Sequence, residues 1–98
     1  MSYEKYLVEH LRITILRLLL EQTDYTLNES LIADMSTEYG FSPSRDRVRN
    51  ELYWLREQGL VELREPSGLA VATLTERGAD VAAGRALAPG IKRPSPGR

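Results

Sequence analysis

The sequence predicts one mainly α-helical domain that includes a small β-hairpin. Three observations lead to this fold class. Apolar residues recur every three or four positions, capping residues and glycines separate the helical stretches, and two short strand-like runs flank an "EPSG" turn. The expected order over residues 1–87 is helix, helix, helix, hairpin, helix, and residues 88–98 are expected to form a disordered basic tail.

The first two helices are predicted from their apolar stripes and end signals. The first covers about Tyr3 to Glu21, and its stripe consists of Leu7, Leu11, Ile15, Leu18 and Leu19. The second begins within "TLNE", where Thr26 and Glu29 have capping-box spacing and Asn28 is an alternative cap. Gly40 ends it, because glycine accepts the left-handed backbone conformation.

The third helix is expected at about residues 43–58. Ser42 is its predicted N-cap, and Pro43 stands at the first helical position, where a missing N–H costs nothing. Gly59 ends the helix. Its buried face is predicted to carry Val48, Leu52 and Leu55.

A hairpin and a last helix complete the predicted domain. "LVELREPSGLAVATLT" contains two short strands around the turn, and Thr75 caps the helix "ERGADVAAGRAL". Gly78 and Gly84 weaken that helix in isolation, so we expect it to depend on tertiary or intersubunit contacts. The tail, "APGIKRPSPGR", has three prolines, two glycines and three bases, a composition typical of disorder.

Composition excludes several classes of function. The chain has no cysteine and a single histidine, His10, which excludes thiolate and multi-histidine metal sites within one chain. The sequence shows neither a serine with the partners of a catalytic triad nor a phosphate-binding glycine loop, so we expect neither enzyme activity nor a cofactor. The longest strongly apolar stretch, Leu18 to Leu20, is too short for a membrane span, and the N-terminus lacks a signal-peptide layout. We therefore expect a cytoplasmic protein with no membrane partner.

Charge is distributed unevenly along the chain. The formal net charge is −1, but residues 1–40 hold three bases against seven acids, and residues 41–98 hold ten bases against seven acids. The two halves therefore carry −4 and +3. Any surface that faces a polyanion is expected in the second half.

The order of elements favours a winged helix-turn-helix. The short connection at residues 40–43 makes the second and third helices cross steeply, and the hairpin follows the third helix as a wing does. "RVRNELYWLREQGLVELRE" with "LAVATLTERGADVAAG" resembles the winged helix-turn-helix of bacterial repressors of the ArsR, MarR and PadR types. Within these segments, "LREQGLV" is similar to their helix-to-wing junction and "LTERG" to their junction between strand and last helix.

This resemblance covers about residues 11–87 and implies DNA binding by a homodimer. The small size is also similar to that of winged-helix proteins encoded by Mu-like transposable phages. The ArsR-type thiolate metal sensor is absent because the chain has no cysteine, and the enlarged ligand-pocket helices of many MarR proteins are absent too.

The resemblance places the third helix in the DNA major groove, where its matching positions are Ser44, Arg45, Arg47, Arg49, Asn50 and Tyr53. The chemistry suits that role, since arginine binds guanine through two hydrogen bonds and asparagine does the same with adenine. The helix N-terminus, with Ser42 and Ser44, offers hydroxyl and N–H groups to a phosphate. Arg64 is the one base next to the wing turn. The predicted DNA-binding residues are Ser42, Ser44, Arg45, Arg47, Arg49, Asn50, Tyr53 and Arg64.

The same helix has a second interpretation, as an ordinary solvated surface. Arg45 could pair with Glu9 or Asp34, and Arg47 with Glu51 one turn later. Other acids oppose DNA binding. They are Asp46 on the outer face of the helix, Glu65 in the wing turn, and the acidic N-terminal half.

Two functions are therefore open. The first is a DNA-binding transcriptional regulator that dimerises through its first and last helices, which would double its phosphate contacts. The second is a winged-helix adaptor whose acidic surface binds a partner protein without binding DNA.

Overall fold

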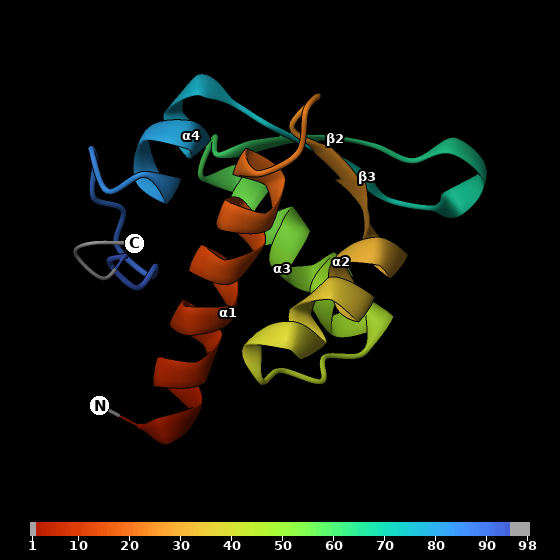
Figure 1. Cartoon of the computed structure of the whole chain (residues 1–98). Coiled ribbons are helices and arrows are strands. Elements are labelled where there is room, and N and C mark those ends of the chain that lie inside the picture. Colours follow the sequence, from red (N-terminus) through yellow and green to blue (C-terminus); the bar gives the residue numbers. More distant parts are fainter. Residues whose placement is uncertain (1, 95–98) are drawn as a thin grey trace.

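The computed structural model describes residues 2–94, which form four α-helices and a small three-stranded antiparallel sheet (Figure 1). The mainly helical class predicted from the sequence is confirmed. The elements follow the chain as α1 (Tyr3–Leu20), β1 (Thr26–Asn28), α2 (Glu29–Ser36), α3 (Arg45–Glu57), β2 (Val61–Arg64), β3 (Val71–Leu74) and α4 (Glu76–Ala82). Short 3₁₀ turns, η1 (Thr37–Tyr39) and η2 (Pro66–Gly68), follow α2 and β2.

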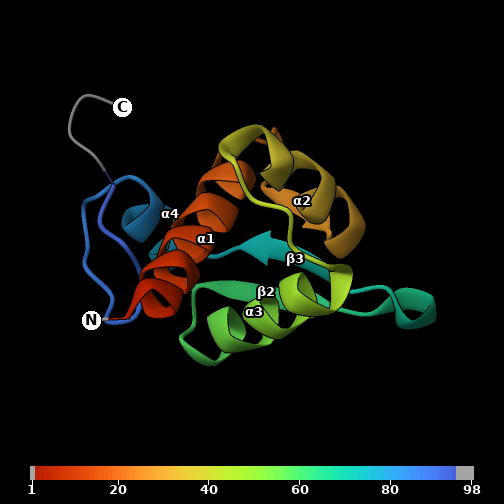
Figure 2. The ribbon, with the colours of Figure 1, turned by 90° about the horizontal axis from the view of Figure 1, so that it is seen from below.

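Helix α1 is the centre of the fold. It packs against α4 on one side and α2 on the other, with the sheet beneath its C-terminal half (Figures 1 and 2). Its predicted apolar stripe is buried from Leu11 onward, whereas Leu7 is half-buried because the first turns of α1 project past the body. Buried residues of α1 meet those of α3, the sheet and α4 in one hydrophobic core.

The sheet has three strands, so the expected two-stranded hairpin is incomplete. The order is β1-β3-β2, with β3 paired antiparallel to both neighbours. Strand β1 was missed because three residues give too short a pattern to recognise. Its pairing covers the outer edge of β3, whose backbone groups would otherwise be exposed.

The structure shows which of the two N-caps expected within "TLNE" begins α2. Asn28 is the N-cap, and its side-chain oxygen accepts a hydrogen bond from the backbone N–H of Leu31 at 2.8 Å. Thr26 lies in β1 instead, where its hydroxyl is 2.9 Å from that of Thr73 on β3. Glu29 therefore occupies the first helical position, directly beside the sheet.

Helix α4 is shorter than predicted. It ends at Ala82 rather than Leu87, because Gly84 has φ +81° and turns the chain out of the helix. Gly78, which was expected only to weaken this helix, is required by the packing around it. A Cβ at this position would overlap the carbonyl oxygen of Leu60 and lie 2.7 Å from Cδ1 of Leu74.

The segment after α4 packs on the domain. Residues 88–94 were assigned to the disordered tail, yet Ala88 and Ile91 contact the hydrophobic core. The carbonyl oxygen of Gly90 accepts a hydrogen bond from Arg12 at 3.0 Å, and the backbone N–H of Lys92 donates to the carbonyl oxygen of Glu9 at 3.2 Å. The rest of the predicted tail, residues 95–98, lies outside the described residues.

Candidate nucleic-acid interface

Helix α3 presents one apolar face to the core and a polar face to solvent. Val48, Leu52 and Leu55 are fully buried, which confirms the predicted inner face. Glu51 is buried as well, beside that face. The outward residues therefore lie where the sequence predicted them, and their partners decide what they can bind.

The start of α3 differs from the prediction. Ser44, not Ser42, is the N-cap, and its hydroxyl accepts a hydrogen bond from the backbone N–H of Arg47 at 3.0 Å. Pro43 precedes the cap instead of opening the helix. Proline disfavours helical conformation in the residue before it, so a cap after Pro43 leaves Ser42 extended without strain. Ser42 is exposed, two residues before the Ser44 cap.

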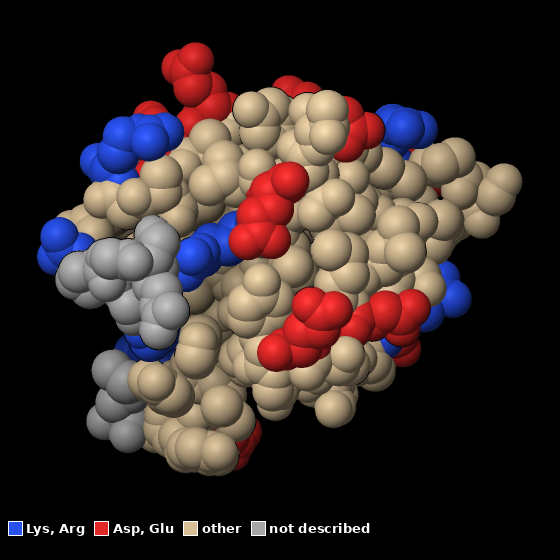
Figure 3. Space-filling model, in the orientation of Figure 1, with Lys and Arg blue, Asp and Glu red and all other residues tan. Residues whose placement is uncertain are grey.

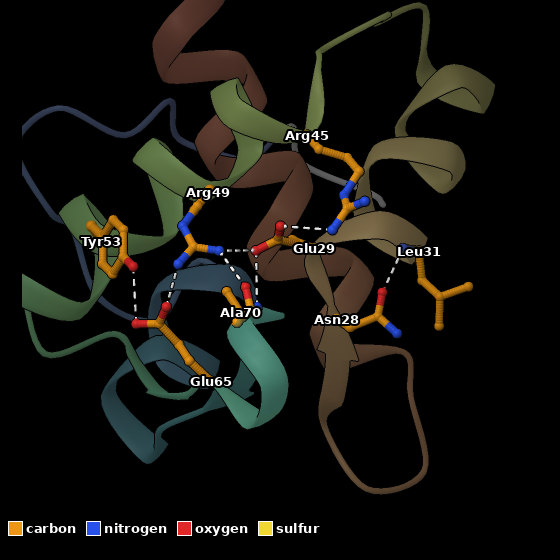
Figure 4. Close-up of polar contacts among 9 residues, drawn as sticks. Asn28, Glu29, Leu31, Arg45, Arg49, Tyr53, Glu65 and Ala70 are labelled. Carbon is orange, nitrogen blue, oxygen red and sulfur yellow. Dashed lines mark hydrogen bonds and ion pairs between the residues drawn. The ribbon is translucent and has the colours of Figure 1, made fainter.

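Glu29 is the buried centre of the polar contacts on this side of the molecule (Figure 4). Its residue is 3% exposed, and its Oε1 accepts a hydrogen bond from Arg45 at 3.1 Å. Its Oε2 accepts from the backbone N–H of Ala70 at 2.9 Å and from Arg49 at 3.0 Å. Burial alone would raise the pKa of Glu29, but these hydrogen bonds and the two arginine charges hold it below its ordinary value.

Arg49 joins α3 to the loop of the hairpin. Besides Glu29, its guanidinium donates to the carbonyl oxygen of Gly68 at 2.8 Å and to the carboxylate of Glu65. The hydroxyl of Tyr53, one turn along α3, donates to the other oxygen of Glu65 at 2.9 Å. Two of the predicted DNA-binding residues, Arg49 and Tyr53, are therefore engaged within the protein, as Figure 4 shows.

Arg47 pairs with Glu51 at 3.2 Å, as the solvated-surface interpretation predicted. Glu51 also accepts a hydrogen bond from Arg12 of α1 at 2.7 Å. The guanidinium of Arg12 lies 3.7 Å from the centre of the Trp54 ring, so Trp54 is a packing residue between α1, α3 and the C-terminal segment. Arg45, in contrast, pairs with Glu29 rather than with the expected Glu9 or Asp34.

The remaining predicted residues stay open to solvent. Asn50 and Ser42 are exposed, and so is Arg64 on β2. The side chains of Arg45 and Arg47 are 58% and 47% exposed despite their ion pairs. The outer face of α3 thus combines accessible hydrogen-bond donors with charges that are partly neutralised by acids of the same chain.

Sequence reasoning missed the importance of two acids, Glu29 and Glu65. Glu29 was considered only as part of a capping box, although a carboxylate at the first position of a helix in an apolar stretch is a candidate for burial with a partner. Glu65 was recognised as unusual for a wing but was not paired with any base. Each lies far along the chain from the arginine it meets, so spacing within α3 could not indicate either contact.

Other kinds of site find little support in the described part of the chain. Residues 2–94 contain no group of three or more histidine, cysteine or acidic side chains that could hold a metal ion. No helix among them has the length and apolar character to cross a membrane. Figure 3 shows small acidic and basic groups separated by uncharged side chains on the face in view.

Comparison with known proteins gives two relatives. The chain is 47% identical over 90 residues to gp26, an uncharacterized protein of Escherichia phage Mu, and the match covers 92% of this chain and 93% of the phage protein. It is 42% identical over 78 residues to an uncharacterized protein of Haemophilus influenzae, covering 79% of this chain and 76% of the relative. No protein-family model matches the chain.

Proposed function

The chain belongs to the family of the phage Mu protein gp26, and we propose that it is a winged-helix protein that binds double-stranded DNA and regulates transcription. In this proposal α3 is the recognition helix and enters the major groove. The loop between β2 and β3 is the wing, and the protein acts as a homodimer.

The exposed face of α3 supports this proposal most directly. Arg45, Arg47 and Asn50 of α3 are each accessible to solvent, and these residue types are the ones that form paired hydrogen bonds with guanine and adenine. The hairpin loop projects from the body (Figure 2), and Arg49 and Tyr53 of α3 hydrogen-bond to Glu65 at its start (Figure 4). A helix and a neighbouring loop can therefore approach one duplex together.

Dimerisation is proposed because a single α3 offers few phosphate contacts. Tyr3 and Tyr6, on the projecting first turns of α1, are 75% and 43% exposed, and Leu87 after α4 is 66% exposed. Exposed large apolar side chains near both predicted interface helices are consistent with a symmetric contact. Two copies would present two recognition helices to a palindromic site.

The test compares a double variant, Arg45→Ala with Arg47→Ala, with a matched control, Arg77→Ala with Arg85→Ala. The control removes the same charge from exposed positions around α4. Because α4 belongs to the proposed dimer interface, the comparison is made at a protein concentration where light scattering gives the control the same mass as the wild type. Binding to a pool of DNA duplexes is measured at two salt concentrations, with circular dichroism to check folding and light scattering to determine mass. We expect each α3 arginine to contribute about 1–3 kcal/mol where it contacts a base, and about one unit of salt slope where it contacts a phosphate.

The alternative function is a protein-interaction adaptor. It is favoured by the observation that Arg45, Arg47 and Arg49 each pair with an acid of the same chain. Equal DNA affinity of the α3 variant and the control, or no binding by the wild type even at low salt, would leave the adaptor as the better explanation. A monomer mass at tens of micromolar would remove the homodimer from the proposal.

A further inference from the structure

The hairpin loop places a carboxylate between two donors of α3. Arg49 and Tyr53, one helical turn apart, donate to the two different oxygens of Glu65 (Figure 4). Arg49 is fixed from behind by Glu29 at 3.0 Å and by the carbonyl oxygen of Gly68 at 2.8 Å. Arg49 is therefore held in position by contacts that do not depend on the Glu65 carboxylate.

The two donors suit a phosphate diester as well as a carboxylate. Both anions present two oxygens that share one negative charge, and arginine binds either through parallel hydrogen bonds. Arg56 adds positive charge nearby, with its guanidinium carbon 5.0 Å from the centre of the Tyr53 ring. The two donors can thus accommodate one anion, with Arg56 as a further base of α3 near Tyr53.

An incoming anion can replace the carboxylate of Glu65 between these two donors. The side chains of Arg49 and Glu65 are 27% and 32% exposed, so water reaches the ion pair. Glu65 lies just after β2, at the start of the loop, and its side chain can turn outward without unpairing a strand. A partly exposed ion pair changes an equilibrium by at most about fivefold, which a DNA phosphate can exceed.

We propose that Arg49 and Tyr53 form a binding site for a phosphate of the DNA backbone, and that Glu65 fills this site until DNA displaces it. The inference rests on the proposed DNA-binding function and assigns to these residues a phosphate contact rather than base recognition. Glu65 then lowers affinity for DNA, since its charge must leave the site and stays close to the incoming phosphate.

The test is Glu65→Gln, with Glu62→Gln as the matched control. Glu62 is exposed on the neighbouring strand β2, and its substitution removes the same charge without touching Arg49. We expect Glu65→Gln to tighten DNA binding by about fivefold at low salt, because one carboxylate charge about 4 Å from a phosphate is removed. The slope of log affinity against log salt should steepen by up to about one unit, because the displaced carboxylate no longer takes up a cation.

Tyr53→Phe separates this site from a general charge effect. It removes the phenol donor and leaves the ring that Arg49 and Arg56 flank. Under the proposal, the gain from Glu65→Gln is smaller in the Tyr53→Phe background than in the wild type.

Three results would overturn the inference. They are equal effects of Glu65→Gln and Glu62→Gln, weaker binding by Glu65→Gln, and an unchanged gain in the Tyr53→Phe background. Those results leave the proposed function standing if the wild type binds DNA. The absence of binding by the wild type and all variants at low salt would instead reject the proposed function together with this inference.

Discussion

Replacement of Glu29 is the sharpest test of how α3 is held. Glu29 accepts three hydrogen bonds on two oxygens, from Arg45, Arg49 and the backbone N–H of Ala70. Glutamine has one oxygen and one donating amide group. If that oxygen takes the place of Oε2, it still accepts from Arg49 and Ala70, while the amide faces Arg45, whose exposed side chain can turn into solvent.

The expected losses follow from this geometry. In Glu29→Gln, two hydrogen bonds lose the assistance of a negative charge, which costs about 1–2 kcal/mol of unfolding free energy. In Glu29→Ala, the buried N–H of Ala70 has no acceptor and Arg49 loses its inner partner, so we expect a loss of about 3–4 kcal/mol. An unfolding free energy that is much lower for Glu29→Ala than for Glu29→Gln is the signature of a buried acceptor.

The low pKa of Glu29 adds a pH dependence of known sign. Because the folded-state pKa lies below the ordinary value of 4.5, the ionised carboxylate stabilises the fold fully above that value. This stabilisation is lost as pH falls through the folded pKa. Arg45 and Arg49 are the charged groups that face Glu29. The difference in unfolding free energy between wild type and Glu29→Gln should therefore shrink on acidification, because the wild type loses the stabilisation by the ionised carboxylate.

The measurement is urea unfolding of wild type, Glu29→Gln, Glu29→Ala and the exposed control Glu62→Gln, at about pH 7 and about pH 3.5. The control should stay within about 0.5 kcal/mol of the wild type. A loss below about 1 kcal/mol for Glu29→Ala, or a constant gap between wild type and Glu29→Gln at both pH values, would refute the reasoning.

Two further predictions concern α4 and the segment after it. Gly78→Ala should destabilise the fold by about 1–3 kcal/mol because the new Cβ meets the carbonyl oxygen of Leu60, whereas glycine-to-alanine changes inside helices normally stabilise. A higher melting temperature for this variant would contradict the close approach. Truncation after Leu87 should lower the unfolding free energy by about 1–3 kcal/mol, since it removes the apolar contact of Ile91 and the acceptor of Arg12 at Gly90. The fluorescence of the single tryptophan, Trp54, should shift to the red, and unchanged emission and stability would show that the segment does not pack on it.

The sequence predicted those parts of the fold that have a long repeating pattern. The apolar stripe of α1 and the inner face of α3 were correct because each extends over several turns. The boundaries were less predictable, because two residues could serve equally well. Ser42 and Ser44 flank the same proline, and Thr26 and Asn28 compete for the start of α2. Asn28 rather than Thr26 caps α2 because β1 pairs with β3 and Glu29 packs against that sheet.

The contacts of the C-terminal segment could not be predicted from its composition. Prolines and glycines indicated disorder, but Pro89 and Gly90 lie in a segment that packs on α1 through only a few groups. One is a backbone carbonyl that accepts from Arg12, and another is the side chain of Ile91. Arg12 itself is off the apolar stripe of its helix, so the pattern indicates no contact for it. It instead connects Glu51, Trp54 and Gly90.

In the candidate site, too, the sequence predicted which way the side chains point but not which residues they contact. Helical periodicity correctly placed the arginines outside the core, but it could not identify the acids that meet them. Those acids change what DNA binding by α3 would involve. A phosphate that approaches Arg45 or Arg47 competes with a carboxylate already in place, which weakens sequence-independent attraction. Asn50 is exposed outside these ion pairs, so a contact with a base edge keeps its full effect. Under the proposed function, the ion pairs of Arg45 and Arg47 would therefore weaken the contacts of these arginines with phosphates and with bases, whereas a contact of Asn50 would be unaffected.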